Sequence, residues 1–283
     1  MTNIEFEHKT AIERLVALMK MLRNKNFGCP WDLEQSIESL IPFTLEEVYE
    51  VVDAIEKKDM VELEDELGDL LFQVVFYAQI AQEEDLFNFD DVANAITNKL
   101  VRRHPHVFPE GEVTNFGTKP QISSDQVVVN WELIKKEEKL ARKTSESAAN
   151  GIESVLDDIP RAMPALERSR KIQRRAANVG FDWQEILPVV SKIKEEVEEL
   201  EEAISNGNSA AIESELGDVL FAVVNIARHT NVDPESALRN ANSRFENRFK
   251  WIEAKLQTDG KSITEMNLQQ LDQLWEEAKF NGL

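Results

Sequence analysis

Four acidic residues in the first half of the chain have a spacing suited to binding a metal ion. Glu47 and Glu50 lie three residues apart, and so do Glu66 and Asp69. Residues three or four apart on a helix share one face, so two such helices can bring their carboxylates together. These oxygen ligands suit Mg²⁺, with Mn²⁺ as a substitute. Because no His or Cys accompanies them, the pattern argues against zinc.

The same acids recur in the second half, 149 residues later, as Glu196, Glu199, Glu215 and Asp218. Comparing residues 46–76 with residues 195–225 without a gap gives 15 identities in 31 positions. Glu46 and Glu195 precede the acids in the two copies. We interpret the chain as an internal duplication whose repeated part is an acid cluster.

An acidic run on a helix is usually a solvated face, and this remains the simpler interpretation for residues 195–202 alone. Glu66 and Asp69 differ, because their helix is apolar nearly all round, as a buried helix would be. Burying several carboxylates without compensation costs roughly several kcal/mol each. The sequence therefore predicts a cation bound beside Glu66 and Asp69.

Basic and aromatic residues follow the acids in both halves. A cation beside a metal can clamp phosphates, and a tryptophan can either stack on a base or pack in a core. Recurrence at offsets of 145 and 144 residues favours the functional alternative. The residues are Lys99, Arg103, Trp131 and Lys135 in the first half, and Arg244, Arg248, Trp275 and Lys279 in the second.

Helical periodicity runs through almost the whole chain, with no convincing strand pattern, so we predict an all-α fold of tandem duplicated helical domains. Thr144–Gly151 is the predicted boundary between domains at residues 1–145 and 152–283. Residues 110–124 are expected to form an irregular connection. The predicted helices span 9–23, 42–57, 60–82, 90–103, 128–143, 168–175, 188–206, 209–228, 234–256 and 268–280.

Composition narrows the class of partner. The net charge of −21, from 53 acids and 32 bases, argues against a nucleic-acid polymer or an anionic membrane surface. A single cysteine, Cys29, suits a reducing compartment, and no apolar run approaches the ~18 residues of a membrane span. We expect a cytoplasmic protein. No glycine-rich phosphate loop is present, which excludes a P-loop enzyme.

The two acid patterns, with the strings GCPWD, ELGDLLFQVVFYAQ and RRHPHVF in the first half and KIQRRAANVGFDW and ELGDVLFAVVN in the second, resemble the MazG nucleoside triphosphate pyrophosphohydrolases of the two-domain bacterial type. The resemblance covers essentially the whole chain. It implies an all-α fold, a homodimer whose subunits complete each other's helix bundles, and Mg²⁺-dependent hydrolysis of an NTP or dNTP to the monophosphate and pyrophosphate.

The resemblance also implies roles for individual residues. Metal ligands would be Glu196, Glu199, Glu215 and Asp218, with Glu47, Glu50, Glu66 and Asp69 at the matching positions. Glu195 and Glu46 would either contact the metal ligands from outside the coordination sphere or help to orient a water molecule. Phosphate contacts would be Lys192, Arg244, Arg248 and Lys279, and Trp275 would contact the base.

The second half is predicted to be the main catalytic one, because the family's basic helix and GFDW loop are complete there. The alternative is a helical regulatory or scaffold protein that binds nucleotide or Mg²⁺ without turnover. A stacking tryptophan is compatible with every base, so base and sugar preference are left open.

Overall fold

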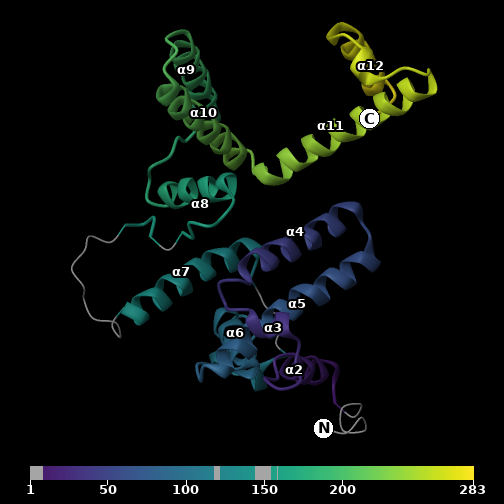
Figure 1. Cartoon of the computed structure of the whole chain (residues 1–283). Coiled ribbons are helices and arrows are strands. Elements are labelled where there is room, and N and C mark those ends of the chain that lie inside the picture. Colours follow the sequence, from purple (N-terminus) through teal and green to yellow (C-terminus); the bar gives the residue numbers. More distant parts are fainter. Residues whose placement is uncertain (1–8, 118–121, 144–153, 158) are drawn as a thin grey trace. The chain divides into compact units, whose positions relative to one another are not determined.

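The computed structural model describes residues 9–117, 122–143, 154–157 and 159–283. Within these ranges the chain consists of helices and their connections, without strands, which confirms the all-α prediction (Figure 1). It divides into two compact units, Met1–Ala148 and Ala149–Leu283. The boundary predicted at Thr144–Gly151 lies outside the described residues.

In the first unit, α2 and α4 both pack against α5. The next helix in the chain, α6, also contacts α5. The elements are α2 (Ala11–Leu22), α3 (Pro30–Glu34), α4 (Ile41–Lys57), α5 (Met60–Glu83), α6 (Phe89–Arg103), the 3-10 turns η1 (Pro109–Gly111) and η2 (Val113–Asn115), and α7 (Ser124–Lys143).

The second unit repeats this plan, with α8 and α9 packed against α10. The two long helices α9 and α10 lie side by side, and α12 packs on α11 (Figure 1). The elements are α8 (Ala165–Ala177), α9 (Ile186–Ser205), α10 (Ser209–His229), α11 (Pro234–Thr258), the 3-10 turn η3 (Ile263–Glu265) and α12 (Leu268–Phe280).

The turn that joins the two acid-bearing helices is also repeated. It needs a left-handed residue, which is Lys58 (φ 59°) in the first unit and Gly207 (φ 65°) in the second. The next residue caps the following helix, since Asp59 accepts hydrogen bonds from two backbone N–H groups of α5 and Asn208 accepts one from α10. Short caps of this kind fix where α5 and α10 begin.

The predicted helices agree closely with the observed ones because proline and caps mark their ends. Pro42 and Pro188 lie in the first turns of α4 and α9, and Asp233 caps α11. Among the α-helices of the described residues, the five-residue α3 was not predicted, because it is too short to show periodicity. Within the predicted irregular connection, the structure forms η1 and η2.

The prediction that the helix carrying Glu66 and Asp69 is buried nearly all round is wrong for the single chain. In α5, Leu67, Leu71 and Val74 are 50%, 39% and 36% exposed. Further along the same helix, Val75 and Phe76 are fully buried. An apolar residue lies inside only where the fold supplies a neighbour, and the described residues of the first unit leave this part of α5 partly uncovered.

The same exposed stripe occurs in α10, where Leu216, Leu220 and Val223 are 48%, 50% and 45% exposed. These three residues lie 149 positions after Leu67, Leu71 and Val74. We refer to the six residues together as the exposed leucine stripe. Its repetition indicates a common role for this face in both units.

None of the helices within the described ranges is long and apolar enough to serve as a membrane span.

Gly28, after α2, permits a close backbone turn. A Cβ atom there would collide with the Leu22 carbonyl oxygen and lie 2.6 Å from that of Asn24. We expect Gly28→Ala to lower the free energy of unfolding by about 1–3 kcal/mol, because backbone atoms cannot move aside as a side chain can. Urea unfolding measures the loss. Asn26→Ala, an exposed substitution in the same loop, is the matched control, and equal stability of the two variants would contradict the prediction.

Candidate metal and nucleotide site

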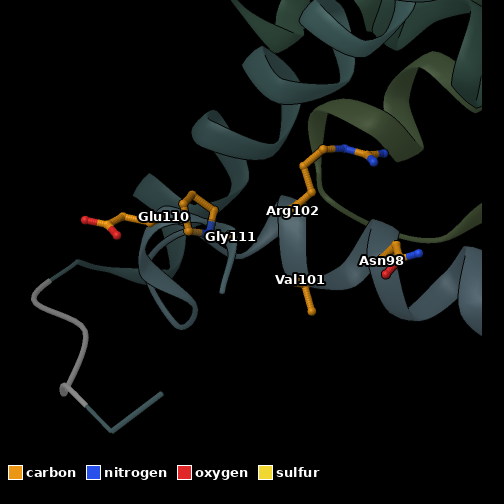
Figure 2. Close-up of a pocket in the computed structure, with 6 residues that line it drawn as sticks. Asn98, Val101, Arg102, Glu110 and Gly111 are labelled. Atoms are coloured by element: carbon orange, nitrogen blue, oxygen red, sulfur yellow. The ribbon is translucent and has the colours of Figure 1, made fainter. Parts of the chain in front are cut away.

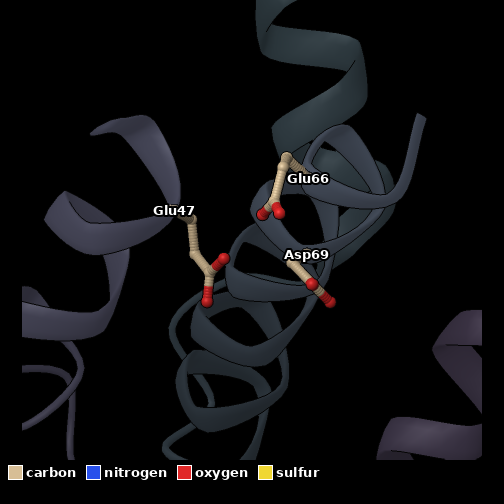
Figure 3. Close-up of side chains that lie close together, drawn as sticks. All are labelled: Glu47, Glu66 and Asp69. Atoms are coloured by element: carbon tan, nitrogen blue, oxygen red, sulfur yellow. The ribbon is translucent and has the colours of Figure 1, made fainter. Parts of the chain in front are cut away.

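Three carboxylates from two helices meet in the first unit. Glu47 comes from α4, and Glu66 and Asp69 come from α5. One oxygen of each lies within 4.8 Å of the others, a spacing that a single ion can bridge. Figure 3 shows Glu47 facing the other two side chains across the gap between the helices.

The pKa values of these acids reflect the crowding. Desolvation raises the pKa of Glu47, and repulsion from Asp69, Glu50 and Glu66 raises it further. Desolvation likewise raises the pKa of Glu66, followed by repulsion from Glu50 and Asp69. Charges of one sign that are held together and partly removed from water are stabilised by a cation, and an all-oxygen donor set fits Mg²⁺ or Mn²⁺.

The second unit brings together the matching three acids, Glu196 from α9 with Glu215 and Asp218 from α10, again within 4.8 Å. Glu196 is buried, with 7% of its surface exposed. Lys192 makes ion pairs with it at 2.8 Å and with Glu195 at 2.7 Å, and these pairs raise the lysine's pKa.

The lysine has no counterpart in the first unit. The position 149 residues before Lys192 is Phe43, a half-buried residue packed against the core. The second acid cluster therefore has a cation built in beside it, whereas the aligned position of the first is apolar.

The remaining predicted acids lie at the margin of the two clusters. Glu50 and Glu199 are outside the sets of three, although Glu50 raises the pKa of Glu66. The pKa of Glu199 is itself raised, first by desolvation and then by repulsion from Glu196. Glu46 and Glu195 are exposed. The geometry thus brings together six of the eight predicted metal ligands.

A cavity of ≈ 400 Å³ lies beside the acid cluster of the second unit. Lys192, Glu196 and Asp218 form part of its lining, and the rest is largely apolar and aromatic. We name it the α8 cavity. Its remaining lining residues are Leu156, Ile172, Gln173, Ala176, Phe181, Asp182, Trp183, Val189, Phe221, Ala222, Asn225 and Arg228.

Two substitutions between the copies explain why this space exists in the second unit. Ala222 takes the place of Gln73, and Asn225 takes the place of Phe76. Phe76 is fully buried in the core of the first unit, where it fills volume. A smaller side chain at each position leaves room in the second unit.

Sequence reasoning assigned no role to the amides Gln173 and Asn225. Asn225 does carry a detectable signal, because it ends the apolar run VLFAVV of its helix at the position where the other copy has a phenylalanine. Gln173 carries none, since a glutamine in a basic helix is unremarkable until packing buries it.

Two of the four basic and aromatic residues predicted in the first half, Arg103 and Trp131, contact other side chains of the same unit. Arg103 pairs with Glu138 of α7 at 2.6 Å. Trp131 packs edge-on against His104, with ring centroids 5.2 Å apart. Lys99 is half-buried and Lys135 exposed. For Trp131 the structure shows a packing contact, while a nucleotide contact stays a prediction.

The equivalent residues of the second half gather where α11 meets α12. The guanidinium of Arg248 lies over the Trp275 ring at 5.3 Å, and Phe245 packs on the same ring at 5.0 Å. Lys279 pairs with Glu276 at 2.6 Å, and Arg244 is exposed. Arg248 and Trp275 are thus neighbours, as a phosphate contact beside a base contact would require.

The ion pairs at Glu138 tie α6 to α7 and give a testable pH dependence. Hydrogen bonds from Arg103, and then from Arg102, lower the pKa of Glu138 to about 2. A carboxyl group whose pKa is lowered by folding stabilises the fold at pH values above its ordinary pKa. This stabilisation is lost as the pH falls towards 2. We expect Glu138→Gln to cost about 1–2 kcal/mol at pH 7, with a cost that shrinks steadily below roughly pH 4.5.

Urea unfolding of both proteins between neutral and acidic pH measures this difference. Glu137→Gln removes a charge from an exposed neighbour on the same helix and serves as the control. A cost independent of pH would show that the ion pairs are not its source.

A second cavity, of ≈ 560 Å³, lies at the end of α6 in the first unit. Figure 2 shows Arg102 and Asn98 on the helix and Glu110 and Gly111 on the turn beside it. No member of the three-acid cluster lines it. Since Arg102 is paired with Glu138, this cavity offers little free positive charge for an anionic ligand.

Comparison with known proteins places the duplicated helices in a family. The MazG nucleotide pyrophosphohydrolase domain matches residues 35–108 and 184–252, once in each unit. The nucleoside triphosphate pyrophosphohydrolase of Escherichia coli strain K12 is 47% identical over 270 residues, covering 95% of this chain and 97% of that protein.

A nucleoside triphosphate pyrophosphohydrolase/pyrophosphatase MazG of Thermotoga maritima is 43% identical, covering 94% of this chain and 95% of that protein. YabN of Bacillus subtilis strain 168 is 40% identical over 93% of this chain and half of its own length. Both domain matches contain the acid clusters that the structure assembles. The chain therefore belongs to the MazG nucleotide pyrophosphohydrolase family.

Proposed function

We propose that this protein hydrolyses nucleoside or deoxynucleoside triphosphates to the monophosphate and pyrophosphate, with the main catalytic site in the second unit. The observation that carries the proposal is the cluster of Glu196, Glu215 and Asp218 with Lys192 beside it and a cavity adjoining it. The names of the relatives from Escherichia coli and Thermotoga maritima support the same activity.

The carboxylates of Glu196, Glu215 and Asp218, with Glu199 at the margin, would hold Mg²⁺ or Mn²⁺. The bound ion would supply charge neutralisation for the triphosphate and a lowered pKa for a coordinated water. The matching acids of the first unit, Glu47, Glu50, Glu66 and Asp69, could hold an ion in the same way.

The remaining steps fall to the protein's own side chains. Lys192 would release its carboxylate partners and bind a phosphate oxygen, while Glu195 orients the attacking water and accepts its proton. Water oxygen then bonds to the α-phosphorus, and the bond from that phosphorus to the bridging oxygen of the β-phosphate breaks, with its electron pair leaving on pyrophosphate. Arg244, Arg248 and Lys279 would offset the charge of the leaving group.

We further propose that the protein acts as a homodimer in which the exposed leucine stripe is covered by the partner subunit. A contiguous apolar face on an acid-bearing helix would otherwise lie in water, and its repetition in both units supports a common partner surface. Size-exclusion chromatography with light scattering measures the mass. A cytoplasmic location and the lack of a nucleic-acid partner stay predictions.

The alternative function is binding of nucleotide or Mg²⁺ without turnover. Incubation of the full chain with a panel of NTPs and dNTPs and Mg²⁺, followed by measurement of pyrophosphate, separates the two. We expect release of pyrophosphate in equal amount to the monophosphate. Absence of release from every nucleotide, by a chain that binds Mg²⁺, would favour the scaffold.

A further inference from the structure

We propose that the exposed basic face of α8 attracts the anionic triphosphate as it approaches the second-unit site and so speeds its association. This face consists of Lys171, Arg174 and Arg175. The inference rests on the proposed function, because it concerns how the substrate reaches that site. It goes further in giving a role in association to residues that lie outside the metal ligands and the phosphate contacts.

The charge of α8 is opposite to that of the chain as a whole. The helix carries five bases and one acid, whereas the chain has 32 bases, 53 acids and a net charge of −21. The helix in the matching place of the first unit, α2, carries only two bases and one acid. The basic character is therefore specific to the unit that also has Lys192 beside its acid cluster.

The charges of the basic face are available to a ligand. Another base of the helix, Arg170, is already paired with Glu167 at 2.8 Å and with Asp233 at 3.5 Å. The three side chains of the basic face are exposed, and in the part of the chain that the structure describes no carboxylate forms an ion pair with them. Arg175 donates a hydrogen bond to the Val155 carbonyl oxygen at 3.2 Å, which leaves its charge without a counter-ion.

The basic face lies next to the α8 cavity. Ile172 of α8 lines this cavity together with Glu196 and Asp218 of the acid cluster. Arg175 follows Ile172 by three residues and Lys171 by four, so each pair consists of neighbours on the helix surface. Such neighbours have Cβ atoms about 5–6 Å apart, which is less than the Debye length of about 8 Å at physiological ionic strength. Salt therefore screens the attraction between this face and an anion at the cavity only in part.

A triphosphate that approaches this site also meets negative charge. Three carboxylates form the acid cluster, and Glu195 and Glu198 are exposed on the same helix as Glu196. Repulsion from these groups slows association, whereas a local patch of opposite charge can raise association rates by about ten- to a thousandfold. Charges at the edge of a binding site act mainly on association and on its salt dependence. We therefore expect the basic face to change how fast the substrate binds and to leave bond breaking unchanged.

The test measures association and dissociation separately. Stopped-flow fluorescence follows the binding of a fluorescent, non-hydrolysable analogue of ATP to the full chain, with Mg²⁺ present, at several salt concentrations. Lys171→Glu combined with Arg174→Glu reverses two charges and leaves the hydrogen bond of Arg175 in place. We expect association to be about tenfold slower at low salt and dissociation to be unchanged. The difference should shrink towards 1 M salt, where the Debye length is about 3 Å.

Three further variants separate the charge of this face from other effects. Lys171→Gln combined with Arg174→Gln removes the charges without reversing them and should show a smaller loss of the same kind. Lys171→Arg combined with Arg174→Lys keeps both charges and should match the wild type. Lys20→Glu combined with Lys25→Glu makes the same change in net charge at exposed positions on and just after α2, and it should also match the wild type. Circular dichroism confirms that each variant is folded.

An association rate that is unchanged by charge reversal at every salt concentration would overturn the proposal. So would an equal loss in the Lys20 and Lys25 variant, because net charge alone would then be responsible. Faster dissociation with unchanged association would also overturn it, since that result indicates a direct contact in the bound state.

Pyrophosphate release is measured on the same proteins, so that failure of the proposed function can be recognised separately. The expected binding kinetics without release by the wild type would overturn the proposed function and support the role of the basic face. A wild-type chain that does not bind the analogue would overturn both.

Discussion

Glu215→Gln combined with Asp218→Asn is expected to lower pyrophosphate release from nucleoside triphosphates by at least about a hundredfold. Glu66→Gln combined with Asp69→Asn, the matched change in the first unit, is expected to spare most of the activity. Each pair removes two charged oxygen donors from a cluster of three, and amides are weaker ligands for Mg²⁺ than carboxylates.

The asymmetry follows from what surrounds each cluster. Lys192 lies beside the acids of the second unit, whereas Phe43 occupies the aligned position of the first. Lys192 adds a positive charge that can bind a phosphate oxygen beside the metal, and the first cluster has no such charge at the aligned position. The kinetics of both double variants under identical conditions, with thermal unfolding as a check on folding, measure the division. Retained activity in the second-unit variant would reverse the assignment of the halves.

Adding Mg²⁺ to the metal-free protein is expected to raise its thermal midpoint, and removing it with a chelator to abolish turnover. The clusters hold like charges within 4.8 Å, so an ion that binds only the folded chain stabilises it by mass action. Each double variant should keep only part of this increase. Differential scanning fluorimetry across a Mg²⁺ titration gives the shift, and Ca²⁺-free buffer keeps other ions from contributing.

The same stabilisation should depend on pH in a defined direction. Because the pKa of Glu66 is raised, its ionised form is disfavoured in the folded, metal-free chain, and this penalty disappears as the pH falls through that pKa. Glu66→Gln should therefore stabilise the metal-free protein at pH 7 and lose this advantage in acid. In Mg²⁺ the order should reverse, because the variant lacks a ligand. A Glu66→Gln midpoint unaffected by both pH and Mg²⁺ would contradict a metal site in the first unit.

Much of the fold could be predicted from local sequence. The starts of α4, α9 and α11 follow from Pro42, Pro188 and the cap at Asp233, which act within one helical turn. The pairing of Glu66 with Asp69 follows from spacing within one helix. Which acid of the preceding helix meets this pair depends on how α4 packs against α5, and spacing alone could not separate Glu47 from Glu50.

One prediction went further than local sequence allows. The apolar character of α5 predicted burial nearly all round, yet the described residues leave its part of the exposed leucine stripe partly uncovered. An apolar helix face indicates that the face is suited to burial, but it does not indicate whether the same chain or a second chain covers it. The phosphate contacts of Lys99 and Arg103 stay a prediction, and the structure adds that Arg103 pairs with the carboxylate of Glu138.

The sequence by itself determined the duplication, the helices and the residue types of both acid clusters, because each of these depends on neighbours within a few positions or on direct comparison of the copies. Only the tertiary structure decided which three acids converge, that Lys192 lies against one cluster, and that Ala222 and Asn225 leave a cavity where Gln73 and Phe76 fill space. The physical reason is that close packing is decided between helices. The position of the basic face of α8 beside this cavity became visible only once α8 was packed against α10.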